Sequence, residues 1–132
     1  MKAFVYRNLH KKGYTYSIRA VDGPYKGRVV GYASHLHIMQ PSFHVSEAGR
    51  DRVRLTGRKN VHAGVVGEIA SVFDYIERLP NELVASLYQP PARATEITYN
   101  PRLYETFVVR ATHVPVHNAS ECYITGRTLS IV

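Results

Sequence analysis

The fold is decided by residues 43–69, which read FHVSEAGRDRVRLTGRKNVHAGVVGEI. Ser46 is a typical helix N-cap, because its hydroxyl accepts a hydrogen bond from a free backbone N–H of the first turn. Glu47 places negative charge at the positive end of the helix dipole, and Gly57 suits the left-handed residue that ends a helix. These signals predict one short basic helix over Ser46–Thr56.

Arginine dominates this helix. At about 100° per residue, Arg52 falls inside the apolar arc, whereas Arg50 and Arg54 fall on the opposite face. Arg52 then either packs its stem on the sheet and extends its head to water, or points a forked donor into a concave site for phosphate or carboxylate. The predicted ligand-binding residues are Arg50, Arg52, Arg54, Arg58, Lys59, His62, Arg19 and Tyr16.

The segment after the helix, Asn60–Ile69, alternates apolar and other residues and predicts a strand. It contains Gly64 and Gly67. Glycine inside a strand often marks a close approach by another backbone or by a ligand. We expect the packed helix to make that approach.

The remaining periodicity predicts an α+β protein, mainly antiparallel β-sheet with the basic helix packed on it. A second short helix is expected after Pro80, in an acidic excursion, because Pro suits the first turn of a helix. Pro41 is expected to end the third strand. The predicted strands are Ala3–His10, Tyr14–Val21, Arg28–Ile38, Asn60–Ile69, Glu96–Asn100, Thr106–Thr112, Cys122–Thr125 and Thr128–Val132.

The length of the chain fits one domain, and its charge is unevenly distributed. A chain of 132 residues fits a single domain, with a basic half over 1–69, an irregular segment over 70–95 and C-terminal strands over 96–132. The net charge is +7, and residues 1–60 carry 12 Lys and Arg against 3 acidic residues, whereas residues 61–132 carry 5 against 7. Such a split favours an anionic partner at the basic half.

Several classes of function are excluded. There is no phosphate-binding loop, dinucleotide fingerprint or HExxH motif, and a single cysteine, Cys122, cannot build a thiolate zinc site within one chain. His35 and His37 have a spacing that one metal could use on a strand, but that spacing is common by chance, so we predict no metal and no cofactor. No apolar run is long enough to span a membrane, and the N-terminus lacks the features of a signal peptide.

Two histidines are candidates for catalysis. His44 and His62 flank the basic helix, and a general base, a general acid and a nearby cation are what a metal-free ribonuclease requires. The alternative is that both are polar positions on a half-exposed sheet. The ten tyrosines offer a similar choice, since rings beside Arg and Lys stack bases in nucleic-acid sites, but also pack well on strands.

Three pieces of the chain resemble small tailed-phage proteins. They are Val45–Val53, the run Arg58–Ala63 and the run Ile97–Pro101. The resemblance implies expression in the cytoplasm of an infected bacterium and implies no particular mechanism.

The leading interpretation is therefore a non-enzymatic phage protein that binds nucleic acid or a nucleotide-like anion through its basic half, in host takeover or counter-defence. One alternative is a small ribonuclease or phosphodiesterase that uses His and Arg. Another is an inhibitor that grips an acidic host protein. Opposite charges in the two halves and an exposed C-terminal strand would also support a homodimer.

Overall fold

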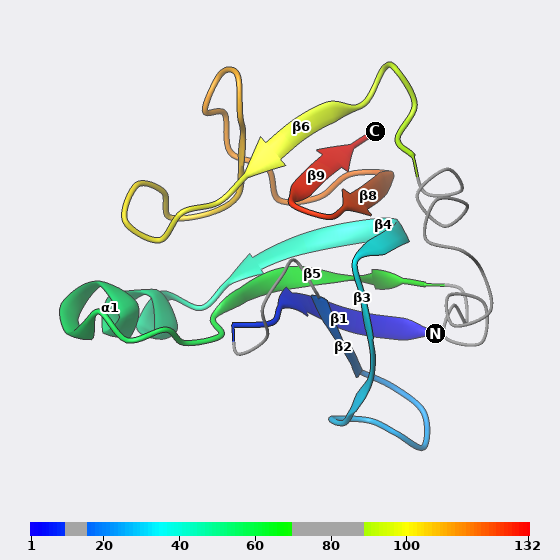
Figure 1. The fold of residues 1–132 in the computed structure, drawn as a ribbon, viewed down its shortest axis with the longest axis horizontal. Helices are drawn as coiled ribbons and strands as arrows, with labels where there is room; N and C mark the ends of the chain where they lie inside the picture. The colour runs from blue at the N-terminus through cyan, green and yellow to red at the C-terminus, as the bar shows by residue number, and fades with distance from the viewer. Residues whose placement is uncertain (10–15, 70–88) are drawn as a thin grey trace.

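The computed structural model describes residues 1–9, 16–69 and 89–132, and this part of the chain forms a nine-stranded antiparallel sheet with one α-helix (Figure 1). The α+β prediction is confirmed at this level, and the expected helix after Pro80 lies outside the described residues. The elements are β1 (Lys2–Arg7), β2 (Tyr16–Ala20), β3 (Val29–Ala33), β4 (His35–Val45), α1 (Glu47–Thr56), β5 (Ala63–Glu68), β6 (Thr95–Thr98), β7 (Val108–Val109), β8 (Glu121–Thr125) and β9 (Thr128–Ile131).

Both chain ends lie inside the sheet. The strand order is β3-β2-β1-β5-β4-β8-β9-β6-β7, so β1 is flanked by β2 and β5, and β9 by β8 and β6. β8 and β9 form a hairpin around Gly126, with pairing from Cys122–Ile131 to Thr125–Thr128. The expectation of an exposed C-terminal strand is wrong, since β6 covers the free side of β9. The edges of the described sheet are β3 and β7.

The two ends of the sheet share one core. Side chains alternate along each strand, and the buried set includes Val5 and Ile18 from one half together with Ile97 from the other. Phe43 of β4 meets Phe107 across this core, with ring centroids 5.3 Å apart. In Figure 1, β6 and β9 lie above β8 and β4, and β5 and β1 lie below them, although residues of both groups share this core. The sheet therefore curls, and its concave side holds the core.

The helix begins and ends where the sequence predicted. Ser46 accepts a hydrogen bond from the backbone N–H of Gly49 at 3.2 Å, and Gly57 adopts φ 69° while its N–H donates to Val53. Both caps are therefore confirmed. No helix in the described ranges is long and apolar enough to cross a bilayer.

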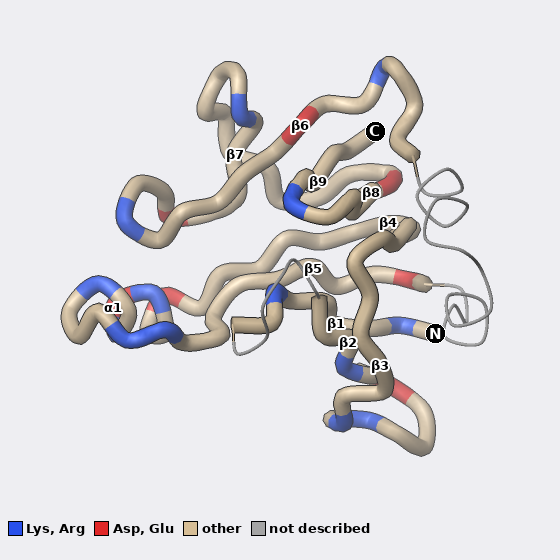
Figure 2. Tube along the Cα trace, viewed as in Figure 1, with Lys and Arg blue, Asp and Glu red and all other residues tan. Residues whose placement is uncertain are grey.

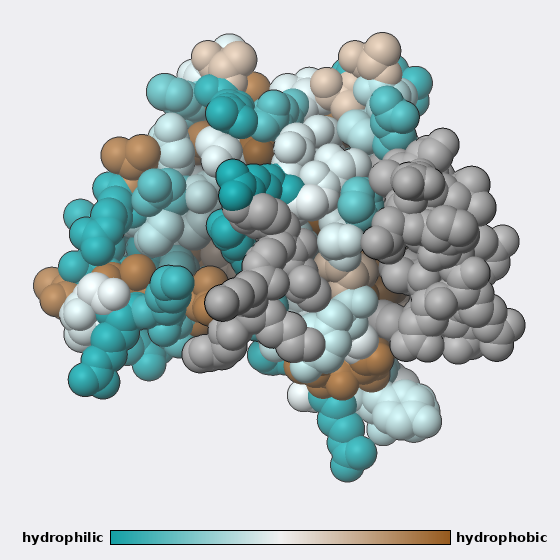
Figure 3. Space-filling model, in the orientation of Figure 1, coloured by the Kyte–Doolittle hydropathy of each residue, from teal (hydrophilic) through white to brown (hydrophobic). Residues whose placement is uncertain are grey.

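Packing of α1 on the sheet face was predicted and is wrong. The helix extends beyond the ends of β4 and β5, Gly49 is its buried residue, and Leu55 is 85% exposed. A Cβ built on Gly49 would lie 2.5 Å from the Cβ of His62, so this glycine is where the helix rests on the segment before β5. Lys and Arg occupy many positions along the helix (Figure 2), and the surface over it is largely hydrophilic (Figure 3).

The third predicted strand, Arg28–Ile38, starts within one residue of β3 but is wrong in its middle and at its C-terminal end. Residues 28–38 form parts of two strands that break at Ser34, whose carbonyl accepts from the N–H of Gly126 at 2.8 Å. The second of them, β4, continues through Pro41 to Val45. Proline is tolerated there because the pairing with β5 shifts register between Met39 and Ser42, and Gln40 has φ 49°.

The glycines of β5 are approached by strands and not by the helix. A Cβ on Gly64 would lie 2.5 Å from the ring of Phe4 and 2.6 Å from the carbonyl oxygen of Val5. A Cβ on Gly67 would collide with the side chain of Ile38 in β4. The predicted close approach is thus real, but it comes from the two strands that flank β5: β1 approaches Gly64, and β4 approaches Gly67.

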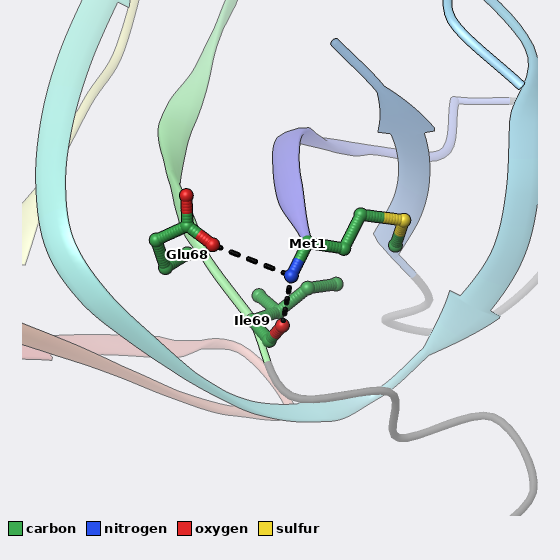
Figure 4. A network of polar contacts seen from close by, with 3 residues as sticks. All are labelled: Met1, Glu68 and Ile69. Atoms are coloured by element: carbon green, nitrogen blue, oxygen red, sulfur yellow. Dashed lines mark hydrogen bonds and ion pairs between the residues drawn. The ribbon is translucent and has the colours of Figure 1, made fainter. Parts of the chain in front are cut away.

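The N-terminus closes the pairing of β1 with β5. The Met1 ammonium donates to the carbonyl of Ile69 at 3.0 Å and lies 3.3 Å from the Glu68 carboxylate (Figure 4). The ammonium is partly buried, and a charged donor strengthens such a hydrogen bond. These contacts hold the first residue of β1 against the end of β5.

Candidate anion-binding cavity

A cavity of about 320 Å³ opens where β1, β5, β6 and β9 meet the end of α1. It lies on the concave side of the sheet and continues the core towards solvent. The described residues that line it are Val5, Tyr6, Arg7, Leu9, Tyr16, Val53, Lys59, Asn60, Val61, His62, Ala63, Gly64, Val65, Ile97, Thr98, Tyr99, Pro101, Phe107, Arg127 and Leu129.

The charged groups at this cavity have one sign. Arg7 ends β1, Lys59 follows α1, and Arg127 occupies the turn between β8 and β9. Among the described lining residues there is no Asp or Glu. Cations that converge on a concave, partly apolar surface raise the local positive potential, because low-dielectric walls focus the field. This arrangement favours a bound anion.

The deep wall is apolar and aromatic. Val5, Val65 and Ile97 are core residues that also line the cavity. Tyr16 lies opposite Arg7 in the register of β1 and β2 and is 8% exposed. Burial raises the pKa of Tyr16, against a smaller lowering by the charge of Arg7, so its hydroxyl stays protonated at neutral pH.

His62 and Tyr99 form the polar centre of the cavity. Nδ1 of His62 lies 2.8 Å from the carbonyl oxygen of Asn60, and Nε2 lies 2.7 Å from the hydroxyl of Tyr99. Because a carbonyl oxygen only accepts, Nδ1 carries the proton, and in the neutral ring Nε2 accepts from the tyrosine hydroxyl. Burial raises the pKa of Tyr99 by more than the charge of Arg50 lowers it. The hydroxyl therefore keeps its proton and can donate it to a hydrogen bond.

Three neighbours position this pair. Gly49 leaves room for the β-carbon of His62, as described above, and Phe107 stacks at a tilt on Tyr99 with centroids 5.2 Å apart. Arg50 donates from Nε to the carbonyl oxygens of Pro101 and Tyr104, at 3.1 and 2.8 Å. The helix therefore holds the loop that follows Tyr99 through one arginine.

The structure separates the eight predicted ligand-binding residues. Tyr16, Lys59 and His62 meet in the cavity. Arg50 is half-buried and serves the loop, and Arg52, Arg54 and Arg58 are exposed. Arg19 lies on the opposite face of the sheet, over the rings of Phe4 and Tyr6.

The predicted orientation of two helix arginines is reversed. Arg52 was expected to face the sheet, but it is exposed and its Nε lies 3.4 Å from the carbonyl of Ala48. Arg50 was expected to face solvent, but the 101–104 loop covers it. Because the helix extends past the sheet, the side of the helix that is covered is the side that faces the 101–104 loop. The apolar arc therefore does not mark the buried side of this helix.

The two candidate catalytic histidines do not meet in the cavity. His44 is exposed in β4, next to Phe43, whose side chain enters the core, so His44 points to the other face of the sheet. His37 also lies away from the cavity, stacked on Tyr123 and 3.1 Å from the Glu121 carboxylate.

Sequence reasoning missed Arg7, Tyr99 and Arg127 as residues of one site. They lie in three segments far apart in the chain, and no motif links them. The available signals were weak: a cation at the end of a strand, a tyrosine before an Asn-Pro turn, and an arginine in a Gly-Arg turn.

The fold and cavity define a small β-rich protein, with a basic and aromatic cavity at one end of a curled sheet. The family model for the Mycobacterium phage L5 gene 82 protein matches residues 1–131. The chain is also 37% identical over 128 residues to the "Gene 82 protein" of Mycobacterium phage L5, with 94% of this chain and 90% of that protein covered. The chain therefore belongs to the Mycobacterium phage L5 gene 82 family, and the resemblance to phage proteins is confirmed. No solved structure matches it.

Proposed function

We propose that this phage protein binds a small phosphate-bearing ligand of nucleotide type in the cavity, in the cytoplasm of the infected bacterium. The observation that carries the proposal is the lining: Arg7, Lys59 and Arg127 around apolar walls, with His62 and Tyr99 at the centre and no carboxylate among the described lining residues. Withdrawing a host nucleotide in this way would serve host takeover or counter-defence.

The residue types suit the two parts of such a ligand. A guanidinium presents a planar fork that matches phosphate oxygens, and a Lys ammonium adds a point charge. The apolar walls and tyrosine rings suit a base, since aromatic side chains stack on its π-face. A volume of about 320 Å³ is at the lower end of ligand pockets, which favours a mononucleotide over a polymer.

Binding is best tested with defined probes. Isothermal titration with AMP, GMP, cyclic AMP and inorganic phosphate separates recognition of the base from recognition of the phosphate. Lys59→Ala should weaken nucleotide binding by about tenfold, as expected for one charge-assisted hydrogen bond at the lower end of its range. Arg54→Ala is the matched control, because Arg54 is also exposed and does not line the cavity.

Comparison of the two variants distinguishes binding inside the cavity from binding to the basic surface of the protein. Binding to a basic surface weakens steeply with salt and depends on charge alone. Equal effects of Lys59→Ala and Arg54→Ala, or no heat with any probe, would contradict the proposal.

A second candidate, the phosphodiesterase or ribonuclease, is favoured by one observation. Nε2 of His62 accepts a hydrogen bond inside a cationic cavity, which is the geometry of a general base beside a phosphate site. His44 lies on the other face of the sheet and cannot be its partner, so among the described lining residues a tyrosine is the candidate proton donor. Hydrolysis of RNA or a cyclic nucleotide that His62→Gln abolishes would support catalysis.

The homodimer and the acidic host protein remain predictions. A homodimer formed by pairing between strands would use β3 or β7, because these are the edges of the described sheet. Sedimentation showing a monomer at micromolar concentration would count against it.

A further inference from the structure

We infer that the convex face of the sheet carries a second binding surface, which takes single-stranded nucleic acid. The surface consists of Phe4, Tyr6, Arg19 and Tyr32, and is named here the outer platform. In the strand register, Phe4 lies opposite Arg19, while Ser17 lies between Tyr6 and Tyr32.

Alternation along the strands places these side chains away from the core. Val5 lies between Phe4 and Tyr6 in β1 and is 1% exposed. Ile18 precedes Arg19 in β2 and is 0% exposed. Phe4 and Tyr6 do not belong to the described core cluster, although both are large aromatic residues. The outer platform is therefore aromatic surface that the core does not require.

The rings and the guanidinium form a stacked group. The Phe4 and Tyr6 centroids are 5.4 Å apart, and the Arg19 guanidinium carbon lies 5.7 and 5.2 Å from them. Phe4 lies over Gly64, whose missing side chain leaves that part of the face flat. Tyr32 at the edge strand is 47% exposed. A nucleobase stacks on either an aromatic ring or a guanidinium plane, so both components of the group suit it.

The surrounding charge selects a polyanion. Lys2 shares the face with Phe4 by alternation, and the loop between β2 and β3 carries Lys26 and Arg28 against one acidic residue, Asp22 (Figure 2). The carboxylate of Glu68, which lies opposite Lys2 in β5, is compensated by the Met1 ammonium at 3.3 Å. Single-stranded nucleic acid supplies unpaired bases for the rings together with phosphates for the cations. Duplexes hide their base faces, so they satisfy only the second need.

This surface is distinct from the proposed nucleotide cavity. Phe4, Arg19 and Tyr32 do not line the cavity, and Tyr6 is the member that borders both. Each surface can therefore be tested by its own substitutions while Tyr6 is left unchanged. A negative result for one surface then does not count against the other.

The test is fluorescence anisotropy with a short labelled oligouridine, a short oligodeoxythymidine and a hairpin duplex of equal charge. Arg19→Ala and Tyr32→Ala should each weaken single-strand binding by roughly 5- to 100-fold, the range for loss of one stacked base. Arg54→Ala and Leu103→Ala are the matched controls: Arg54 is exposed on α1, and Leu103 is 69% exposed in the loop after β6, so neither belongs to the outer platform or to the loop between β2 and β3. Both should stay within about twofold of the unchanged protein.

Photocrosslinking with a thiouridine oligonucleotide provides a readout that does not depend on variants. Crosslinks on the peptides that contain Phe4 or Tyr32 support the inference. Absence of single-strand binding at low salt, equal affinity for the duplex, or equal losses in the control variants would overturn it. Loss of oligonucleotide binding in Lys59→Ala alone would transfer that binding to the cavity and also overturn it.

Discussion

Gly49→Ala is the sharpest test of how the helix positions the cavity. Replacing Gly by Ala inside a helix normally stabilises by about 1 kcal/mol. Here the new methyl group would lie 2.5 Å from the Cβ of His62 and 3.3 Å from Nδ2 of Asn60. Neither β-carbon can rotate away, so the helix must move, at the upper end of the overpacking cost, about 3 kcal/mol.

The net expectation is a loss of about 2 kcal/mol, which lowers Tm by roughly 6–10 °C in a domain of this size. Urea and thermal unfolding measure it. His62→Gly removes the opposing Cβ, so in the Gly49→Ala background it should cost less than it does alone. Gly57→Ala is the control: Gly57 has φ 69° with nothing within 4 Å, so its loss of stability should add to that of His62→Gly. A Gly49→Ala protein that melts at or above the unchanged protein would refute the argument.

Two further predictions follow from buried contacts. Arg50→Ala should lower the free energy of unfolding by about 2 kcal/mol, because the carbonyls of Pro101 and Tyr104 lose a charged donor. Arg52→Ala should lower it by under about 0.5 kcal/mol, because Arg52 is exposed. Equal unfolding midpoints of the two variants in urea would contradict this. Burial raises the pKa of Cys122 from 9.0 to about 12, so above pH 9.0 the unfolded chain releases a proton that the folded chain keeps. Stability should then fall with a slope approaching about 1.4 kcal/mol per pH unit, and Cys122→Ala should flatten that slope by this amount in urea titrations; an unchanged slope would exclude the thiol.

Local signals predicted α1 well because its determinants are local. Ser46 and Gly57 act within one turn of the chain, so their roles are legible in the sequence alone. The turn at Gly126 is of the same kind. What surrounds the helix is not local: whether Arg50 or Arg52 faces inward depends on a loop about fifty residues further along the chain.

Strand ends were harder where pairing overrides propensity. Pro41 normally ends a strand because it lacks an N–H. In this chain the shifted register between Met39 and Ser42 removes the need for that donor, and β4 continues. That shift is a property of the pairing between two strands, and no residue of β4 reveals it alone. The glycines of β5 behave similarly, since Gly64 and Gly67 are explained only by Phe4 and Ile38 across the sheet.

The cavity shows the same limit at the level of function. Charge asymmetry pointed to residues 1–60 as the anion-binding half, and Arg7, Tyr16 and Lys59 do lie in the cavity. Its other side, however, comes from Tyr99 and Arg127 in the half with net negative charge. Curling of the sheet brings residues of β6 and β9 to the same cavity as residues of β1 and β5, so a cation from the acidic half joins cations from the basic half. Net charge along the chain therefore locates one wall of such a site, and topology supplies the other.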